Sequence, residues 1–316
     1  MFQDQADADE PLHLRLFVPP TFEGVTSVAV IQEVLRSNII LDVVYTYNLD
    51  FRDYTKFKGA EMILVLGLAY RGYNLPQEFY TEVDAPFMDF VHFSTYGKEI
   101  PGQHIVSRVD EERDPIKVLF DLLRLSPDTT NLSKYITFTD KSEWLVNAIN
   151  SYRTWTWEGN DTTRVLIALY HASFKRLPRL MKGLSLQEVL KAHAPIIKGQ
   201  MERMEDYIER KAATVKEQTV TVDGQQCLLK VVFAEDYINE LANDLLSKRP
   251  VGVPTIVCVG RSTKGNDIFS IRTAGVHAGR VAELINEGGG KESVATVFSG
   301  VGYAELMRNA IATKLV

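Results

Sequence analysis

The residues with the clearest chemical use are an arginine, three consecutive glycines and a lysine. Arg272 lies in an apolar stretch typical of a strand, and Gly288, Gly289, Gly290 and Lys291 follow a short helical segment. An arginine can hold a phosphate or carboxylate through two parallel hydrogen bonds. Consecutive glycines let the backbone approach a ligand and adopt dihedral angles closed to other residues. The pattern predicts an anion site, although a helix C-cap followed by a loop would also place glycines here.

Other side chains could extend or complement this site. Arg261 and Lys264 lie on or near the neighbouring strand and could enlarge the basic patch. Four large aromatic residues could stack on bases: Trp144, Tyr152, Trp155 and Trp157. The same aromatic side chains could instead pack in the core.

The elements that position these residues begin with alternating apolar runs and helical spacings. Strands are expected at 13–18, 41–47, 61–68, 87–93 and 104–107. Helices are expected at 26–36, 114–125, 142–152 and 161–175. The central residues of the strands are almost all apolar, as in a parallel sheet covered on both faces. Strands alternating with helices predict a doubly wound, mainly parallel α/β sheet.

The second half of the chain has a different pattern. A long charged helix is expected over 185–217, where Pro195 should kink it or divide it. Asp223-Gly224 lies between two apolar runs and predicts a hairpin. Helices are then expected at 235–246, 277–286 and 303–314, and strands at 218–222, 227–233, 255–260 and 268–273. This half therefore predicts a smaller α+β domain at the end of the long helix.

Four segments follow from this organisation. They are a disordered tail at 1–12, an α/β domain at 13–184, a linker helix at 185–217 and a C-terminal domain at 218–316. The long linker helix could support a dimer.

Length and composition limit the class of protein. The chain has 316 residues, 45% of them hydrophobic and 24% charged, as expected for a globular protein of two domains. No apolar run reaches the roughly 18 residues of a membrane span, and the acidic N-terminus does not resemble a signal peptide. Cys227 and Cys258 lie in apolar runs and predict buried thiols in a cytoplasmic protein. The net charge of −6 argues against a surface that coats nucleic acid, but not against a local basic cleft.

The stretch around Arg272 resembles the substrate-binding C-terminal domain of the DHH phosphoesterases, the RecJ and nanoRNase superfamily. In that family an Arg-Ser strand and a Gly-Gly-Gly-Gly-His loop hold the nucleotide end of the substrate. This chain has Arg272-Thr273 and the loop Glu287-Gly-Gly-Gly-Lys291, with lysine in place of histidine. The resemblance extends over most of the chain and implies a DHH-like domain joined to a DHH-associated, substrate-binding-like domain.

The resemblance also locates the family's metal ligands. The first family motif is His-x-Asp-x-Asp-Gly, and this chain has Pro19, Thr21 and Glu23 at its three ligand positions. The second motif ends an apolar strand with aspartate, where this chain has Gly67. Proline and glycine have no donor side chain, and a threonine hydroxyl is a poor ligand for Mn²⁺.

The third and fourth motifs are also altered. The Asp-His-His motif falls on Val91-His92-Phe93, where His92 remains and could equally be a core residue. The fourth motif places an aspartate just before Thr-Trp or a similar pair, and this chain has Arg153 before Thr154-Trp155. A fixed positive charge at that position would repel a cation. We expect no bound metal or other cofactor, leave Glu23 and His92 as weak candidate ligands, and expect Arg153 to pair with Glu23.

Three functions remain open. The first is an inactive DHH-type homologue that binds a nucleotide, a nucleic-acid end or a protein partner in the cleft between its domains. The second is an active phosphodiesterase on short oligonucleotides or cyclic nucleotides, with Mn²⁺ or Mg²⁺ held by Glu23, Asp89, His92 and Asp140. The third is a purely structural or assembly protein.

Overall fold

A computed structural model describes residues 11–157, 161–262, 266–286 and 288–300. Contacts divide the chain into an N-terminal unit, Met1–Met201, and a C-terminal unit, Glu202–Val316. Nearly all of the expected tail and the whole helix expected at 303–314 lie outside the described residues. Within the described ranges, no helix is long and apolar enough to cross a membrane.

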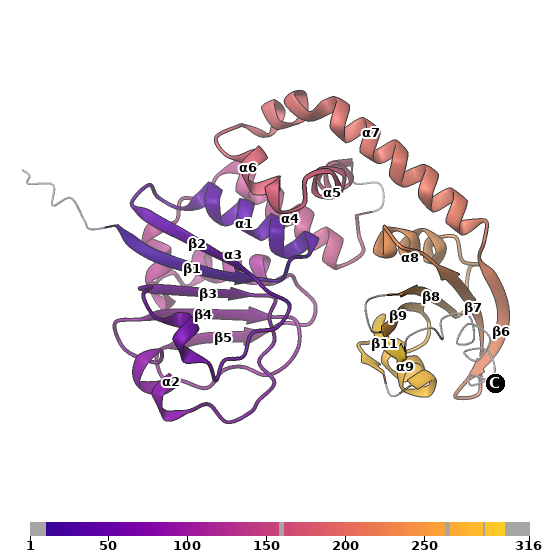
Figure 1. Ribbon diagram of the computed structural model, residues 1–316, viewed down its shortest axis with the longest axis horizontal. Coiled ribbons are helices and arrows are strands. Elements are labelled where there is room, and N and C mark those ends of the chain that lie inside the picture. Colours follow the sequence, from indigo (N-terminus) through magenta and orange to yellow (C-terminus); the bar gives the residue numbers. More distant parts are fainter. Residues whose placement is uncertain (1–10, 158–160, 263–265, 287, 301–316) are drawn as a thin grey trace, which may run out of the picture. The chain divides into compact units, whose positions relative to one another are not determined.

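The N-terminal unit is built on a five-stranded parallel sheet (Figure 1). Its strands are β1 (Leu12–Val18), β2 (Ile39–Tyr45), β3 (Met62–Leu66), β4 (Asp89–Ser94) and β5 (Ile105–Val109). They are arranged in the order β2-β1-β3-β4-β5, and all neighbours are parallel. The carboxyl ends of all five strands therefore meet at one edge, called here the carboxyl edge.

The two faces of this sheet are covered differently. One face is covered by helices α1 (Phe22–Val34), α3 (Pro115–Leu125) and α4 (Asp140–Arg153), with α1 and α3 both packing on α4 (Figure 1). On the other face, aromatic side chains of β1, β4, the short helix η1 (Tyr54–Phe57) and α2 (Gln77–Glu82) form one apolar cluster. The central strands β3 and β4 are thus buried on both faces, the edge strands β2 and β5 are only partly buried, and the parallel sheet with its helices confirms the α/β class.

Three further helical segments complete the N-terminal unit after α4. They are α5 (Asp161–Ser173), α6 (Leu177–Met181) and the first part of α7 (Leu186–Ala212). The expected start of one helix was wrong, and one of the two alternatives expected for α7 is excluded. Helix α1 begins four residues earlier than expected, because the Thr21 hydroxyl caps it by accepting a hydrogen bond from the Gly24 amide. Pro195 does not divide α7; the Lys191 carbonyl that loses its helical donor is on an exposed residue, so water can satisfy it.

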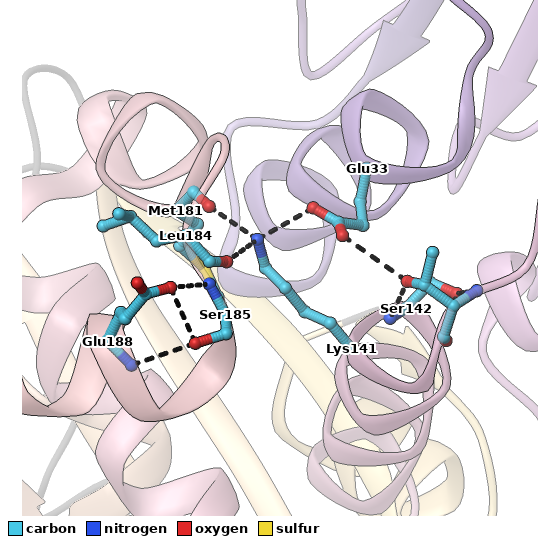
Figure 2. A network of polar contacts seen from close by, with 8 residues as sticks. Glu33, Lys141, Ser142, Met181, Leu184, Ser185 and Glu188 are labelled. Atoms are coloured by element: carbon cyan, nitrogen blue, oxygen red, sulfur yellow. Dashed lines mark hydrogen bonds and ion pairs between the residues drawn. The ribbon is translucent and has the colours of Figure 1, made fainter.

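A buried lysine joins three parts of this unit (Figure 2). Lys141 of α4 is 8% exposed, and its ammonium group donates to Glu33 of α1 at 2.8 Å. It also donates to the carbonyls of Met181 and Leu184, at 2.6 and 2.7 Å. All three ammonium protons therefore have acceptors, which is what makes a buried charge tolerable.

The C-terminal unit contains a six-stranded mixed sheet in the order β10-β11-β9-β8-β7-β6. Its strands are β6 (Lys216–Val222), β7 (Gln225–Phe233), β8 (Thr255–Ser262), β9 (Asn266–Ala274), β10 (Gly289–Gly290) and β11 (Val294–Gly300). Helix α8 (Ile238–Ser247) packs on one face and α9 (Ala278–Asn286) on the other. Each face thus has its own apolar cluster.

The hairpin predicted at Asp223-Gly224 is confirmed. Both residues have positive φ, 47° and 84°, as a two-residue turn between strands of right-handed twist requires. The two cysteines are buried free thiols, as expected, and burial raises the pKa of Cys258 to about 12.

Candidate functional site

The positions of the lost metal motifs lie together at the carboxyl edge. In the strand order β2-β1-β3-β4-β5, the chain crosses from one side of β1 to the other between β2 and β3. In sheets with such a reversal, ligands usually bind outside the carboxyl ends of the two strands at which the order reverses, here β1 and β3. Pro19, Thr21 and Glu23 follow β1, and Gly67 follows β3.

Proline and glycine replace donors here and pack against each other. A Cβ at position 67 would lie 3.4 Å from Cγ and Cδ of Pro19, so the proline ring lies over Gly67. Gly67 has φ +75°, a conformation that glycine adopts without strain. A Cβ at position 24 would lie 2.0 Å from the Pro19 carbonyl oxygen, which requires glycine there too.

Asp114 is a buried carboxyl that the sequence reasoning did not single out. It caps α3 by accepting a hydrogen bond from the Ile116 amide at 3.0 Å, and its own amide donates to Asn150 of α4 at 3.0 Å. Burial, and after it the Glu23 carboxylate, raises the pKa of Asp114 to about 7, although the Ile116 amide and Arg153 act to lower it. These three charged side chains are therefore close enough to interact at the carboxyl edge. The sequence does contain one local signal for Asp114: an aspartate directly before Pro115 is typical of the residue that caps the start of a helix.

Arg153 is the last residue of α4, where a positive charge favours the helix dipole. Its Nε is enclosed and has no hydrogen-bond partner among the described residues. The expected ion pair between Arg153 and Glu23 is not formed in the described part of the chain. Arg153 instead contributes to the electrostatic environment of Asp114.

His92 lies in the core of the sheet and is fully buried. Its Nε2 lies 2.8 Å from the Leu68 carbonyl, which can only accept, so Nε2 carries the proton. Nδ1 then accepts from the Ser107 hydroxyl at 2.8 Å. Burial lowers the pKa of His92 to about 4, which keeps the ring neutral. Both ring nitrogens already have protein partners, so in this arrangement neither lone pair is available to a cation.

The four candidates for an active site do not come together. Asp89 begins β4, at the opposite edge of the sheet, and accepts from the Thr130 hydroxyl and the Leu132 amide at 2.6 and 2.8 Å. Asp140 begins α4 and Arg153 ends it, so the two lie about 20 Å apart. Asp140 is therefore far from Asp114, whose amide donates to Asn150 near the other end of α4.

The residues at the carboxyl edge do not match the donor set of a two-metal centre. No group of three or more histidine, cysteine, aspartate or glutamate side chains suited to a metal lies within the described ranges. The Thr21 hydroxyl is engaged as a helix cap, and Pro19 covers Gly67. Glu23 and Asp114 remain as carboxyls, with the guanidinium of Arg153 near them. Two donors beside a fixed cation are too few to hold a pair of divalent ions.

The aromatic residues of the fourth motif pack on one another. Tyr152 lies 4.4 Å from Phe22 of α1, measured between ring centroids, and stacks on Trp155 at 6.4 Å. Trp157 is 7% exposed and lies 6.2 Å from Tyr152. These contacts favour the alternative in which the aromatic side chains pack in the core. Trp144 is half-buried on the same helix as Tyr152.

In the C-terminal unit, Arg272 of β9 is held by protein acceptors. Its guanidinium donates to the Ile271 carbonyl and to the side-chain oxygen of Asn239 of α8, both at 2.8 Å. Arg272 therefore lies on the α8 face of the sheet. Arg261 is exposed on β8 and is four residue steps from the position that pairs with Arg272, about 13 Å along the strand. Lys264 lies outside the described residues.

Two of the three glycines, Gly288 and Gly290, are required by close packing. A Cβ at position 290 would lie 2.4 Å from Cα of Ala295 on β11, and one at position 288 would lie 2.6 Å from a Val297 methyl. A Cβ at position 289 would meet nothing within 4 Å. None of the three has φ in the left-handed region. The glycines therefore serve close approach of backbones, and the expected need for unusual dihedral angles is not found.

The loop after the glycines accepts hydrogen bonds from the first amides of α9. The carbonyls of Lys291 and Glu292 accept hydrogen bonds from the Gly279 and Ala278 amides, at 3.0 and 2.7 Å. These amides would otherwise be the donors that bind an anion at a helix start. These two amides are therefore already engaged within the protein.

Comparison with known proteins identifies solved structures that share this fold. No protein-family model matches the chain, and no curated protein matches it. Among solved structures, a DHH-domain protein described as a member of a family of ribosomal proteins has a TM-score of 0.61 and 11% identity. The alignment covers 96% of this chain and 87% of that one.

Two RecJ structures also match. Exonuclease RecJ bound to manganese has a TM-score of 0.51 and 12% identity, over 96% of this chain and 91% of that one. RecJ from Thermus thermophilus in complex with Mn²⁺ has a TM-score of 0.50 and 11% identity, over 96% of this chain and 52% of that one. The chain thus has the fold of DHH-domain proteins along nearly its whole length, with a sequence that has diverged far from theirs.

Proposed function

We propose that this protein is a DHH-fold protein that binds a nucleotide or a short single-stranded nucleic acid without hydrolysing it by two-metal chemistry. The observation that carries this proposal is the set of side chains at the carboxyl edge. There Pro19 covers Gly67, and Arg153 carries a positive charge near Glu23 and Asp114. Phosphodiester hydrolysis by two metals needs two cations about 3.5–4 Å apart, each held by several donors.

The ligand class is supported by two features. RecJ, whose fold this chain shares, is named as an exonuclease and so acts on nucleic acid. Arg272 and Lys291 retain positive charge in the C-terminal unit, where the resemblance to DHH phosphoesterases implies a site for the nucleotide end of the substrate. We propose that Arg272 exchanges its contact with Asn239 for a phosphate when the ligand binds.

Thermal unfolding with and without ligand tests binding. A ligand that binds only the folded state at 100 times its Kd stabilises that state by about 2.7 kcal/mol. We expect a 5′-phosphorylated RNA oligonucleotide to raise the Tm of the full chain, and Arg272→Ala to reduce this increase. Arg249→Ala removes an exposed arginine of the same unit and serves as the matched control. Equal Tm increases in Arg272→Ala and the control would contradict the role of Arg272.

One observation favours a second candidate function, residual phosphodiesterase activity. Asp114 is a carboxyl whose pKa is raised to about 7, and it interacts with the Glu23 carboxylate. Paired carboxyls with separated pKa values are typical of general acid–base sites. Release of mononucleotides that depends on added Mn²⁺ and is lost in Glu23→Gln would support this alternative. Turnover that is absent with and without Mn²⁺ would exclude it.

A further inference from the structure

A small pocket lies at the carboxyl edge of the N-terminal sheet, apart from the lost metal positions. It is formed by the loops that follow β2, β3 and β4. Its volume is about 180 Å³, less than the roughly 300–1,000 Å³ of pockets that enclose a drug-sized molecule. It can therefore enclose only part of a small molecule, such as a single ring, while an attached group lies against the pocket wall. We call it the Tyr-Arg pocket, after Tyr47, Arg52, Arg71, Tyr73 and Tyr96 on its walls.

Two of the tyrosines expose their rings to solvent. Tyr47 is 68% exposed and Tyr96 is 50% exposed, although both are large hydrophobic side chains. They come from different loops, after β2 and after β4, and line the same pocket. Exposed aromatic faces on a concave surface are the usual means of stacking a base without reading its sequence.

The charges of the pocket leave Arg71 uncompensated. Arg52 donates two hydrogen bonds to Asp50, at 2.9 and 2.7 Å, and its guanidinium lies over the Tyr73 ring at 4.7 Å. Arg52 is therefore neutralised within the pocket. Arg71 is exposed and makes no ion pair or hydrogen bond among the described residues. A guanidinium at the pocket wall can bind a phosphate through two parallel hydrogen bonds.

The loops that form the pocket are tied together. The Ser94 hydroxyl donates to the Tyr96 carbonyl at 2.8 Å, and the Lys98 amide donates to the Tyr70 carbonyl at 2.8 Å. The Tyr73 hydroxyl accepts from the Phe51 amide at 2.9 Å, joining the loops after β2 and β3. The walls are thus positioned before any ligand arrives, which reduces the entropic cost of binding.

We infer that the Tyr-Arg pocket binds one nucleotide of the ligand, with the base against the tyrosine rings and the phosphate on Arg71. The inference rests on the proposed function and gives it a specific site within the N-terminal unit. A ring that stacks and an adjacent phosphate are the two groups that every nucleotide presents. The pocket also lies at the carboxyl ends of parallel strands, where ligands of α/β sheets bind.

The test measures binding of 5′-AMP and adenosine to the full chain by calorimetry, with saturation-transfer NMR to show whether the base protons contact protein. Tyr96→Ala is expected to weaken 5′-AMP binding about tenfold, since stacking on an aromatic ring contributes that much per base. Tyr96→Phe keeps the ring and is expected to bind normally. Arg71→Ala is expected to weaken 5′-AMP about tenfold and to leave adenosine unchanged. Arg179→Ala removes an exposed arginine of α6 and serves as the control.

The outcomes separate this inference from the proposed function. If 5′-AMP or RNA binds the wild-type chain, and equally well the Tyr96→Ala and Arg71→Ala variants, the pocket assignment is wrong and nucleotide binding stands. If neither 5′-AMP nor RNA binds the wild-type chain, both the proposed function and this inference fail. Weakening of adenosine by Arg71→Ala would show that Arg71 supports the pocket structure instead of holding the phosphate.

Discussion

Asp114 gives the carboxyl edge a measurable dependence on pH. Its pKa is raised to about 7, mainly by burial. The folded protein therefore keeps a proton that the unfolded chain releases near pH 4. Between about pH 4 and pH 7 the folded state binds more protons than the unfolded state, so stability falls as pH rises through this window.

The variant Asp114→Asn tests this reasoning. Asparagine keeps the oxygen that caps α3 but cannot ionise. We expect the variant to lose the decline in stability between pH 4 and pH 7 and to exceed wild type at pH 8 by on the order of 3 kcal/mol. Urea unfolding at pH 5 and pH 8 measures the difference. Parallel pH profiles of wild type and variant would show that Asp114 titrates normally.

His92 has the opposite pH dependence. The pKa of His92 is lowered to about 4. Between about pH 6.5 and pH 4, the His92 ring is therefore protonated in the unfolded chain but neutral in the folded protein. Stability therefore falls as pH decreases through this window. His92→Leu leaves the Leu68 carbonyl and the Ser107 hydroxyl without the imidazole, and we expect it to destabilise the protein by roughly 2–4 kcal/mol at pH 7. Urea unfolding measures this loss, and an unchanged midpoint would refute the core assignment.

At the scale of elements, the glycine run offers a matched pair of substitutions. Gly290 lies against β11 with no room for a Cβ, whereas Gly289 faces open space. We expect Gly290→Ala to destabilise the protein by roughly 1–3 kcal/mol and Gly289→Ala to change stability by less than about 0.5 kcal/mol. Thermal unfolding distinguishes the two. Similar losses in both variants would mean that the loop needs glycine for its dihedral angles after all.

The Lys141 network joins α1, α4 and the segment before α7 (Figure 2). Lys141→Met leaves Glu33 and two carbonyls without their donor, and we expect a loss of roughly 3–5 kcal/mol. Lys134→Met changes an exposed lysine and should be nearly neutral. The double variant Glu33→Gln/Lys141→Met should recover part of the loss. A single variant as stable as wild type in urea would contradict a structural role for Lys141.

The sequence predicted most of the fold because its elements have strong local signals. The apolar strands of the parallel sheet and the Asp223-Gly224 hairpin follow from periodicity and turn chemistry alone. The start of α1 was misplaced because Thr21, Thr26 and Ser27 are all plausible caps, and only the path of the chain after β1 selects Thr21. The interaction of Asp114 with Glu23 and the Tyr-Arg pocket depend on strand order. They join residues far apart in the sequence, so no local pattern could show them.

At the scale of the whole molecule, the chain has the fold of DHH-domain proteins, while no side-chain group among the described residues has the donors of a two-metal centre. The fold is retained because its strands and helices depend on apolar spacing, which many sequences satisfy. A two-metal centre depends on a few specific donors, which single substitutions remove. A fold shared at 11–12% identity is therefore compatible with a different set of side chains at the carboxyl edge.

Native mass spectrometry of the full chain with Mn²⁺ and a short 5′-phosphorylated RNA tests the central claim most directly. One spectrum reports bound metal, bound RNA and any mononucleotide released. The account predicts a complex with RNA, no stoichiometric Mn²⁺ and no mononucleotide product. Retained Mn²⁺ together with released mononucleotide would contradict it and identify the protein as an active metal-dependent hydrolase.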